Sequence, residues 1–230
     1  MATVTQAIDE IVDFTDNTGT SQTDQSERRR RHLQMLKDRV DYIRYYRDWD
    51  FIRSYTSVAI AAAAGFGYLP TDFLAIGKYG GVYDLLSSGR ALDWVPESVI
   101  LEARVSSTSP SSLAVYSIFG LAIPTPPGTG APQRQIQIPP NATAASLGVA
   151  YNTKAPTLDE STNNANLVLA VPEEYHQTVL IPAIRAKARE SLGDARWRNA
   201  EGDFKEGLKV MLRTCRRSQG TMQRLPSFFG

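Results

Sequence analysis

The chain has 230 residues, 42% of them hydrophobic, and its 25 basic and 24 acidic side chains leave a formal net charge of +1. This composition is ordinary for a globular protein with a buried core, and it excludes a strongly basic nucleic-acid binder. The single cysteine, Cys215, excludes an internal disulfide and a zinc site built from several cysteines.

The longest apolar stretch, Val58 to Phe66, is far shorter than the roughly 20 residues that a membrane-spanning helix needs. The first residues carry acids where a signal peptide carries bases. We therefore expect a soluble, unexported protein with no membrane partner.

Two helices are predicted before the first β-type segment. In the first, from Thr5 to Phe14, Ile8, Ile11 and Val12 recur at helical spacing. The second runs from Asp24, where Glu27 completes a capping box, to about Arg47. Its apolar stripe consists of Leu33, Leu36, Val40 and Ile43. Its other face is basic and consists of Arg28, Arg29, Arg30, Arg31, Lys37, Arg39 and Arg44.

Residues 51–169 form a region rich in Pro, Gly, Ser and Thr that contains short β-type runs. Strands are predicted over residues 51–60, 113–123, 134–138 and 145–151. A short helix is predicted after Pro96, and residues 125–130 favour a hairpin loop. Long polar loops are expected over residues 106–112 and 153–166.

Two further helices are predicted after Pro172. The first continues to about Leu192 with a kink at Pro182, and Gly193-Asp194 separates it from the second. The second has a packing stripe made of Trp197, Ala200, Phe204, Leu208, Met211 and Cys215.

The pattern as a whole predicts an α+β fold, with N- and C-terminal helices forming a bundle that carries a small inserted antiparallel β module. The bundle comprises residues 1–50 and 170–218, and the β-rich module comprises residues 51–169. Residues 219–230 form an extended C-terminal tail.

The tail has no charged residue after Arg224, and Pro226 keeps its end out of a helix. An isolated extended segment cannot bury its own apolar side chains, so we expect this one to fold back or to insert into another chain. The candidate binding residues are Arg224, Leu225, Pro226, Phe228 and Phe229.

Charge is distributed unevenly along the chain. Residues 1–27 hold six acids and no base, whereas residues 185–230 hold eleven bases and five acids. The two ends are therefore able to attract each other or neighbouring copies, although solvated helical faces explain such runs equally well.

Signals for catalysis or metal binding are weak. His32 and His176 have no second ligand at metal-binding spacing, and the segment 77–81 lacks the residue order of a phosphate-binding loop. Cys215 lies on the apolar stripe, which favours a buried hydrophobe over a nucleophile. We expect no catalytic residue, no metal and no cofactor. The arginines 28–31 are candidates for contact with DNA or with a ring lumen, through phosphates and without base reading.

Four sequence features occur in an order that resembles the head-to-tail adaptor (connector) proteins of tailed bacteriophages, of the tail tubular protein A type. An Arg-rich helix leads to Trp49-Asp50-Phe51, and the segment 67–73 is similar to the Tyr-Leu-Pro-Asp-Phe turn of that family. Residues 112–118 followed by 124–127 resemble its Tyr-containing strand and Pro-rich hairpin, and residues 172–203 resemble its closing helix pair. The resemblance covers roughly residues 33–215, and the run Ala61–Ala64 departs from it.

The resemblance implies a structural protein without catalysis. Such adaptors form rings, usually dodecamers, between the capsid portal and the tail nozzle or tail tube, at the head-tail junction of the virion. DNA passes through the ring without sequence-specific binding, and the particle is assembled in the host cytoplasm. In the family a C-terminal extension reaches the portal, and the matching segment here is Gln219 to Gly230.

Three alternatives stay open at this stage. The first is a glycan-processing enzyme with two carboxylates about 5 to 10 Å apart in a cleft. The second is a DNA-contacting packaging or ejection accessory protein, which a steep salt dependence of DNA affinity would indicate. The third is a neck or tail-completion protein of a longer-tailed phage.

Overall fold

The computed structural model describes residues 22–61, 65–78, 80–85, 89–105, 114–122, 131–139, 146–159 and 165–222. The chain divides into two compact units, which we call the helical unit (residues 1–52 and 155–230) and the β unit (residues 53–154). The segment 155–169, which the sequence analysis placed in the β-rich module, thus belongs to the helical unit. The predicted helix at residues 5–14 and the tail beyond residue 222 lie outside the described residues.

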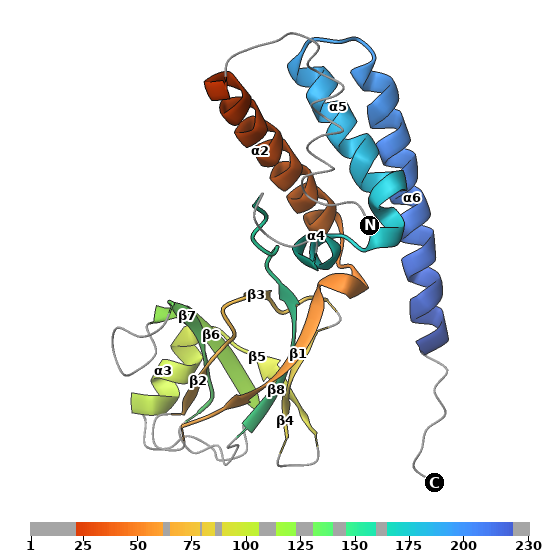
Figure 1. Ribbon diagram of the computed structural model, residues 1–230. Coiled ribbons are helices and arrows are strands. Elements are labelled where there is room, and N and C mark those ends of the chain that lie inside the picture. Colours follow the sequence, from red (N-terminus) through yellow and green to blue (C-terminus); the bar gives the residue numbers. More distant parts are fainter. Residues whose placement is uncertain are drawn as a thin grey trace. The chain divides into compact units, whose positions relative to one another are not determined.

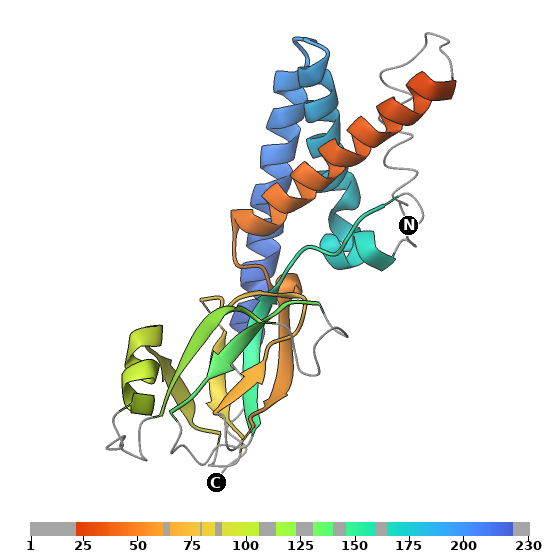
Figure 2. The same cartoon turned by 90° about the vertical axis from the view of Figure 1, so that its left-hand side faces the viewer.

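The helical unit combines long helices with short helical turns. Its elements are α2 (Gln22–Tyr46), η1 (Asp50–Ile52), α4 (Ala165–Ala170), the 3-10 turn η2 (Glu173–Tyr175), the π-helical turn η3 (His176–Leu180), α5 (Ile181–Ser191) and α6 (Trp197–Met222). Within this unit α5 and α6 pack side by side in opposite directions, and α2 packs against α5 (Figure 1, Figure 2).

Helix α2 confirms the predicted apolar stripe, because Leu36, Val40 and Ile43 are fully buried in the core of the helical unit. The capping box is wrong: α2 is already helical at Gln22, so Asp24 lies inside the helix. After the helix, the chain turns at Trp49, which is buried and donates its indole N–H to the carbonyl of Ile43. This bond satisfies one carbonyl that the helix end leaves without an intrahelical partner.

At Pro182 the sequence predicted a kink, and the structure has a change from a π-helical turn to an α-helix just before that residue. Pro182 has no N–H to donate to the carbonyl four residues earlier, that of Thr178. The chain accordingly passes through the π-helical turn η3 and then starts α5, with Pro182 in its first turn. The turn between α5 and α6 has Gly193 at φ +69°, a left-handed conformation that favours glycine.

Helix α6 confirms the predicted packing stripe along its centre, where Ala200, Phe204, Leu208 and Met211 are buried. Gly207, also buried, allows the helix to lie directly against η3. A Cβ atom at this position would collide with the backbone carbonyl of Thr178. The helix includes Gln219 to Met222, so an extended tail begins no earlier than residue 223.

The β unit is shorter than the predicted module but contains more strands than the four predicted, and these strands pair over longer sequence distances. Its elements are β1 (Arg53–Ala59), β2 (Phe66–Tyr68), β3 (Phe73–Ala75), β4 (Gly81–Asp84), β5 (Ala91–Trp94), α3 (Glu97–Val105), β6 (Val115–Ala122), β7 (Gln133–Gln137) and β8 (Ser146–Thr153). The predicted strands correspond to β1, β6, β7 and β8, and the predicted short helix corresponds to α3.

The eight strands form one mixed sheet that curls into a nearly closed barrel (Figure 1, Figure 2). The strand order is β1-β8-β4-β5-β6-β7-β2, and β3 pairs with β8 beside this path. The two ends of this path meet at a bridge between Ala61, two residues after β1, and Phe66 of β2. Gly67 permits this approach, since a Cβ atom there would collide with the carbonyl of Ala59 and the side chain of Val58.

The predicted fold class is therefore wrong. The chain is not a helical bundle with a small antiparallel β module, because the sheet forms a barrel with a core of its own, and β5 pairs with β6 in parallel. The error has a physical cause. Strands β2 to β5 have three or four residues each, too few to show period-two alternation, and a barrel closes through pairs that are remote in sequence.

The interior of the barrel is an apolar cluster, separate from the core of the helical unit. It includes Val58, Leu69, Ile136, Leu147 and Val149, which are all at most 5% exposed. Among the described residues, no helix is long and apolar enough to cross a membrane.

Candidate functional site

The four arginines proposed to contact DNA or a lumen lie in the first turns of α2. Arg30 and Arg31 are exposed, and Arg29 is partly exposed and makes contacts of its own. Arg31 lies 3.9 Å from Glu27, and both side chains are more than two-thirds exposed. The side chain of Arg28 lies outside the described residues. The structure thus places two of the four in solvent without bringing them to a common centre.

The remainder of the predicted basic face is partly internal. Arg44 is 4% exposed and donates to the carbonyls of Leu169 and Ala170 at 3.0 and 3.1 Å. Arg39 pairs with Glu201 at 3.2 Å and lies over the ring of Phe204. These two cations join α2 to the other helices, so they are structural rather than available to a partner.

The C-terminal end of α2 carries an exposed aromatic surface. The tyrosine patch, which we define as Tyr42, Tyr45 and Tyr46, has side chains 46%, 63% and 46% exposed. Tyr42 and Tyr46, one helical turn apart, have ring centroids separated by 5.9 Å. Three large aromatic side chains on one helix end are typical of an interface, because tyrosine is enriched there and loses little conformational entropy on contact.

Cys215 has the surroundings of a packing residue. Its thiol lies beside Tyr175, and burial is the main cause that raises the pKa of Cys215 above its ordinary value. Burial, followed by the neighbouring Cys215, raises the pKa of Tyr175 to about 12. Because a thiolate is the reactive form of cysteine, this position disfavours nucleophilic chemistry.

The proposed portal-binding residues, Arg224 to Phe229, lie outside the described residues. Within the described ranges there is no group of three or more His, Cys, Asp or Glu that could hold a metal ion. The glycine-containing segment 77–81 begins as a turn, with the N–H of Gly80 donating to the carbonyl of Gly77 at 3.0 Å.

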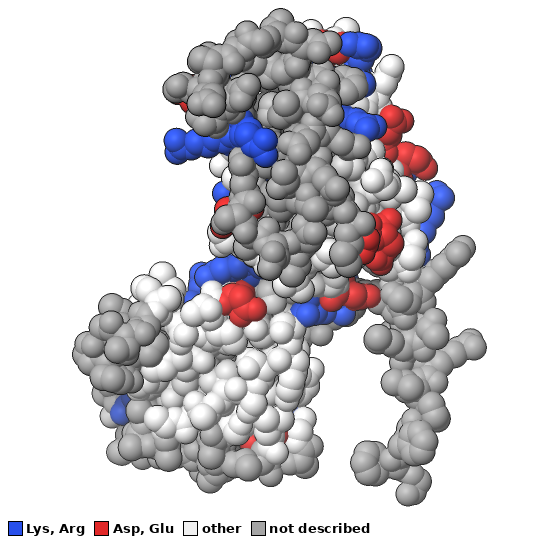
Figure 3. Space-filling model, in the orientation of Figure 1, with Lys and Arg blue, Asp and Glu red and all other residues white. Residues whose placement is uncertain are grey.

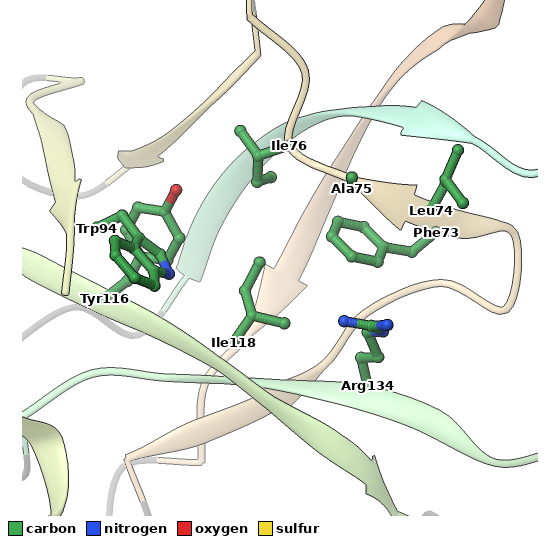
Figure 4. A pocket seen from close by; sticks show the side chains of 8 residues that line it. All are labelled: Phe73, Leu74, Ala75, Ile76, Trp94, Tyr116, Ile118 and Arg134. Atoms are coloured by element: carbon green, nitrogen blue, oxygen red, sulfur yellow. The ribbon is translucent and has the colours of Figure 1, made fainter. Parts of the chain in front are cut away.

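The β unit contains a cavity of about 520 Å³ that sequence reasoning missed (Figure 4). One wall comes from β3 and the residue after it, and the other from β5, β6 and β7. The lining residues are Phe73, Leu74, Ala75, Ile76, Trp94, Tyr116, Ile118 and Arg134. Apart from the guanidinium of Arg134 and the polar atoms of the two aromatic side chains Trp94 and Tyr116, the lining is hydrocarbon.

The cavity lies beside strands with short or irregular pairing. Strand β3 pairs only with β8, with a register shift between Phe73 and Ala75, and β5 meets β6 over two residue pairs. The cavity is continuous with the barrel core, because Phe73 and Tyr116 belong to that core. Trp94 is 61% exposed at the cavity, so a large apolar side chain faces solvent beside an apolar interior.

Few charges surround this cavity. Only 11 of the 102 residues of the β unit are charged, against 49 of 230 in the whole chain. In the view of Figure 3 the described side chains of the β unit are almost all uncharged, whereas the helical unit shows both signs. Burial of the Tyr116 hydroxyl raises the pKa of Tyr116, and the negative charge of Asp93, the residue before Trp94, raises it further. Among the described residues of the lining, Arg134 alone is charged.

No single sequence signal marks this cavity. Its residues come from four strands that are far apart in sequence, and Trp94-Val95-Pro96 drew attention only as the start of α3. Phe73 closes the segment 67–73 that carried part of the family resemblance, but the resemblance assigned it no role.

The comparisons with known proteins do not assign the chain to a class or to a particular protein. No protein-family model matches it, and no curated protein matches its sequence.

Proposed function

We propose that this protein is a structural head-to-tail adaptor that forms a ring between the capsid portal and the tail nozzle or tail tube of a phage particle. The carrying observation is the ordered set of sequence features from the Arg-rich helix to the closing helix pair, roughly residues 33–215. The paired helices α5 and α6 give residues 172–203 a form suited to side-by-side packing of subunits.

Subunit contact is the role that best suits the tyrosine patch. A monomeric soluble protein rarely exposes several large apolar side chains together, and contact with a neighbouring copy would cover them. Ring closure requires a heterologous contact, in which the patch meets a different surface of the next subunit. DNA passes through the lumen, where Arg30 and Arg31 contact phosphates without reading bases.

The portal is the partner proposed for the C-terminal tail. Burying Phe228 and Phe229 contributes roughly 1.5 to 3 kcal/mol for each ring before ordering costs, and repetition around a ring multiplies the effect. Arg224, Leu225 and Pro226 lead this anchor out of α6.

A pull-down with the portal protein of the same virus tests the tail. We expect Phe228→Asp with Phe229→Asp to abolish capture, because a buried carboxylate has no partner in an apolar groove. Ser227→Ala is the matched control within the tail. Unchanged capture of the double variant contradicts the assignment.

The ring itself is tested by native mass measurement of the full chain, alone and with portal. We expect a closed oligomer, twelve copies in the simplest case, and we expect Tyr45→Ala to shift the population toward smaller species. Gln34→Ala, at an exposed position of the same helix, is the control. A protein that stays monomeric with and without portal contradicts the proposal.

A further inference from the structure

We infer that the cavity of the β unit binds the acidic N-terminal segment of a second copy of this chain, with Phe14 as the side chain that enters it. This inference goes beyond portal docking and rests only on the ring-forming part of the proposed function. It names a contact between subunits that joins two different surfaces of the same molecule.

The cavity selects an apolar ligand with a neighbouring acid. Its volume of about 520 Å³ accommodates more than one side chain, and its walls are aromatic and aliphatic. An aromatic ring entering it would displace water from hydrocarbon surface and meet other rings, which stabilises such contacts. Arg134 then offers a charge-assisted hydrogen bond to a carboxylate at the edge.

The N-terminal segment supplies both groups at short spacing. Phe14 is flanked by Asp13 and Asp16, and Ile11 and Val12 precede it. Residues 1–27 contain no base that would oppose Arg134. Phe14 lies eight residues before Gln22, where the described part of α2 begins, so it can reach a neighbour up to about 27 Å from that helix when the connecting residues are extended.

The C-terminal tail is a poorer match for the same cavity. It also carries aromatic side chains, but its only charged side chain is Arg224, and it has no acidic side chain for Arg134. Asp93, at the Trp94 end of the cavity, also constrains the orientation: the carboxylates of the N-terminal segment should lie at the Arg134 end, away from Asp93.

Photo-crosslinking in the full-length protein tests the inference. A benzophenone amino acid at position 14 should give a product of twice the subunit mass, and the crosslinked peptide should contain residues of β3, β5 or β6. The same probe at position 4 is the control within the segment. Trp94→Ala should reduce the yield about fivefold, whereas Leu121→Ala should not change it, although both side chains are more than 60% exposed and lie on the β unit.

A charge exchange separates recognition from misfolding. Arg134→Glu should lower the yield by up to about fivefold, the range of an exposed ion pair, and adding Asp13→Arg with Asp16→Arg should restore it. The inference would be overturned by crosslinks that form only to other surfaces, or by equal effects of Trp94→Ala and Leu121→Ala. It would also be overturned if an added peptide of residues 219–230 reduced the yield more than a peptide of residues 1–21. The portal pull-down uses variants of residues 227–229 alone, so its result and this one are distinguishable.

Discussion

Arg44 shows how a charged residue within a basic run can be structural. Its guanidinium is buried and satisfies two carbonyls at the end of α4, and burial lowers its pKa from the ordinary value. A sequence pattern cannot distinguish it from its solvated neighbours, because the carbonyls that it meets are 125 and 126 residues away.

Arg44→Met should therefore lower the free energy of unfolding by about 2 kcal/mol or more, because two buried carbonyls lose a charged donor. Urea unfolding followed by circular dichroism measures the change. Arg47→Met, at an exposed position just after the same helix, should stay within about 0.5 kcal/mol of the wild type. Equal losses in the two variants would show that the buried hydrogen bonds are unimportant.

The raised pKa of Tyr175 predicts that the free energy of unfolding depends on pH at alkaline pH. Its pKa is raised from 10.0 to about 12 in the folded protein, chiefly by burial, so the folded state holds a proton that the unfolded state releases above pH 10. The stability that this group contributes is complete below pH 10 and is lost as the pH rises toward 12. In Tyr175→Phe the midpoint of urea unfolding should fall less between pH 10 and pH 12 than in the wild type, and a parallel fall would contradict the assignment.

At the scale of elements, the contact between α6 and η3 depends on one missing side chain. The carbonyl of Thr178, which Pro182 leaves without its α-helical donor, faces Gly207 across the interface. The other glycine in the middle of α6, Gly202, is exposed, and a Cβ atom added there would meet no other atom within 4 Å. The two positions therefore form a natural pair for comparison.

Gly207→Ala should destabilise the protein by about 1 to 3 kcal/mol, because the new methyl group forces α6 away from η3. Gly202→Ala should instead stabilise it by up to about 1 kcal/mol, since alanine favours helix more than glycine does. Thermal unfolding measures both changes. A Gly207→Ala variant as stable as the wild type would mean that the two elements pack less closely than described.

Helix periodicity allowed α2, α5 and α6 to be predicted, because each of these long helices records its buried face within a few turns, whereas the short α4 was missed. The stripe of Leu36, Val40 and Ile43 is an example. The barrel could not be predicted in this way. Strand β3 has three residues, and the pairing of Asp93 with Val115 requires a connection through α3, so the information lies in contacts between distant segments.

At the scale of the molecule, two separate hydrophobic cores support two compact units. The candidate cavity belongs to one of them, and its lining residues are each unremarkable in sequence. Only the charge pattern of the N-terminal segment was visible beforehand. The cavity proposed to bind that segment exists only because the barrel brings Phe73, Trp94, Tyr116 and Arg134 together.

Because the two hydrophobic cores are separate, a destabilising substitution in one core should lower the stability of that unit alone. Ile136→Ala removes a fully buried side chain from the barrel and should lower the local stability of the β unit by about 2 to 5 kcal/mol. Hydrogen exchange should then accelerate within residues 53–154 and not in α5 or α6. Ile184→Ala, in the core of the helical unit, should produce the reverse pattern. Acceleration of both units by either substitution would indicate one cooperative fold.

The first and last strands of the β unit are partners, with Arg53 of β1 opposite Asn152 of β8. The polypeptide thus enters and leaves the barrel at points about 5 Å apart. A unit whose two ends lie next to each other can be inserted or removed without moving the residues that flank it. A short linker from Ile52 to Ala155 can therefore replace the barrel, and so can another barrel with adjacent ends. Substitutions in the cavity lining can accordingly accumulate without lengthening or breaking any helix of the other unit.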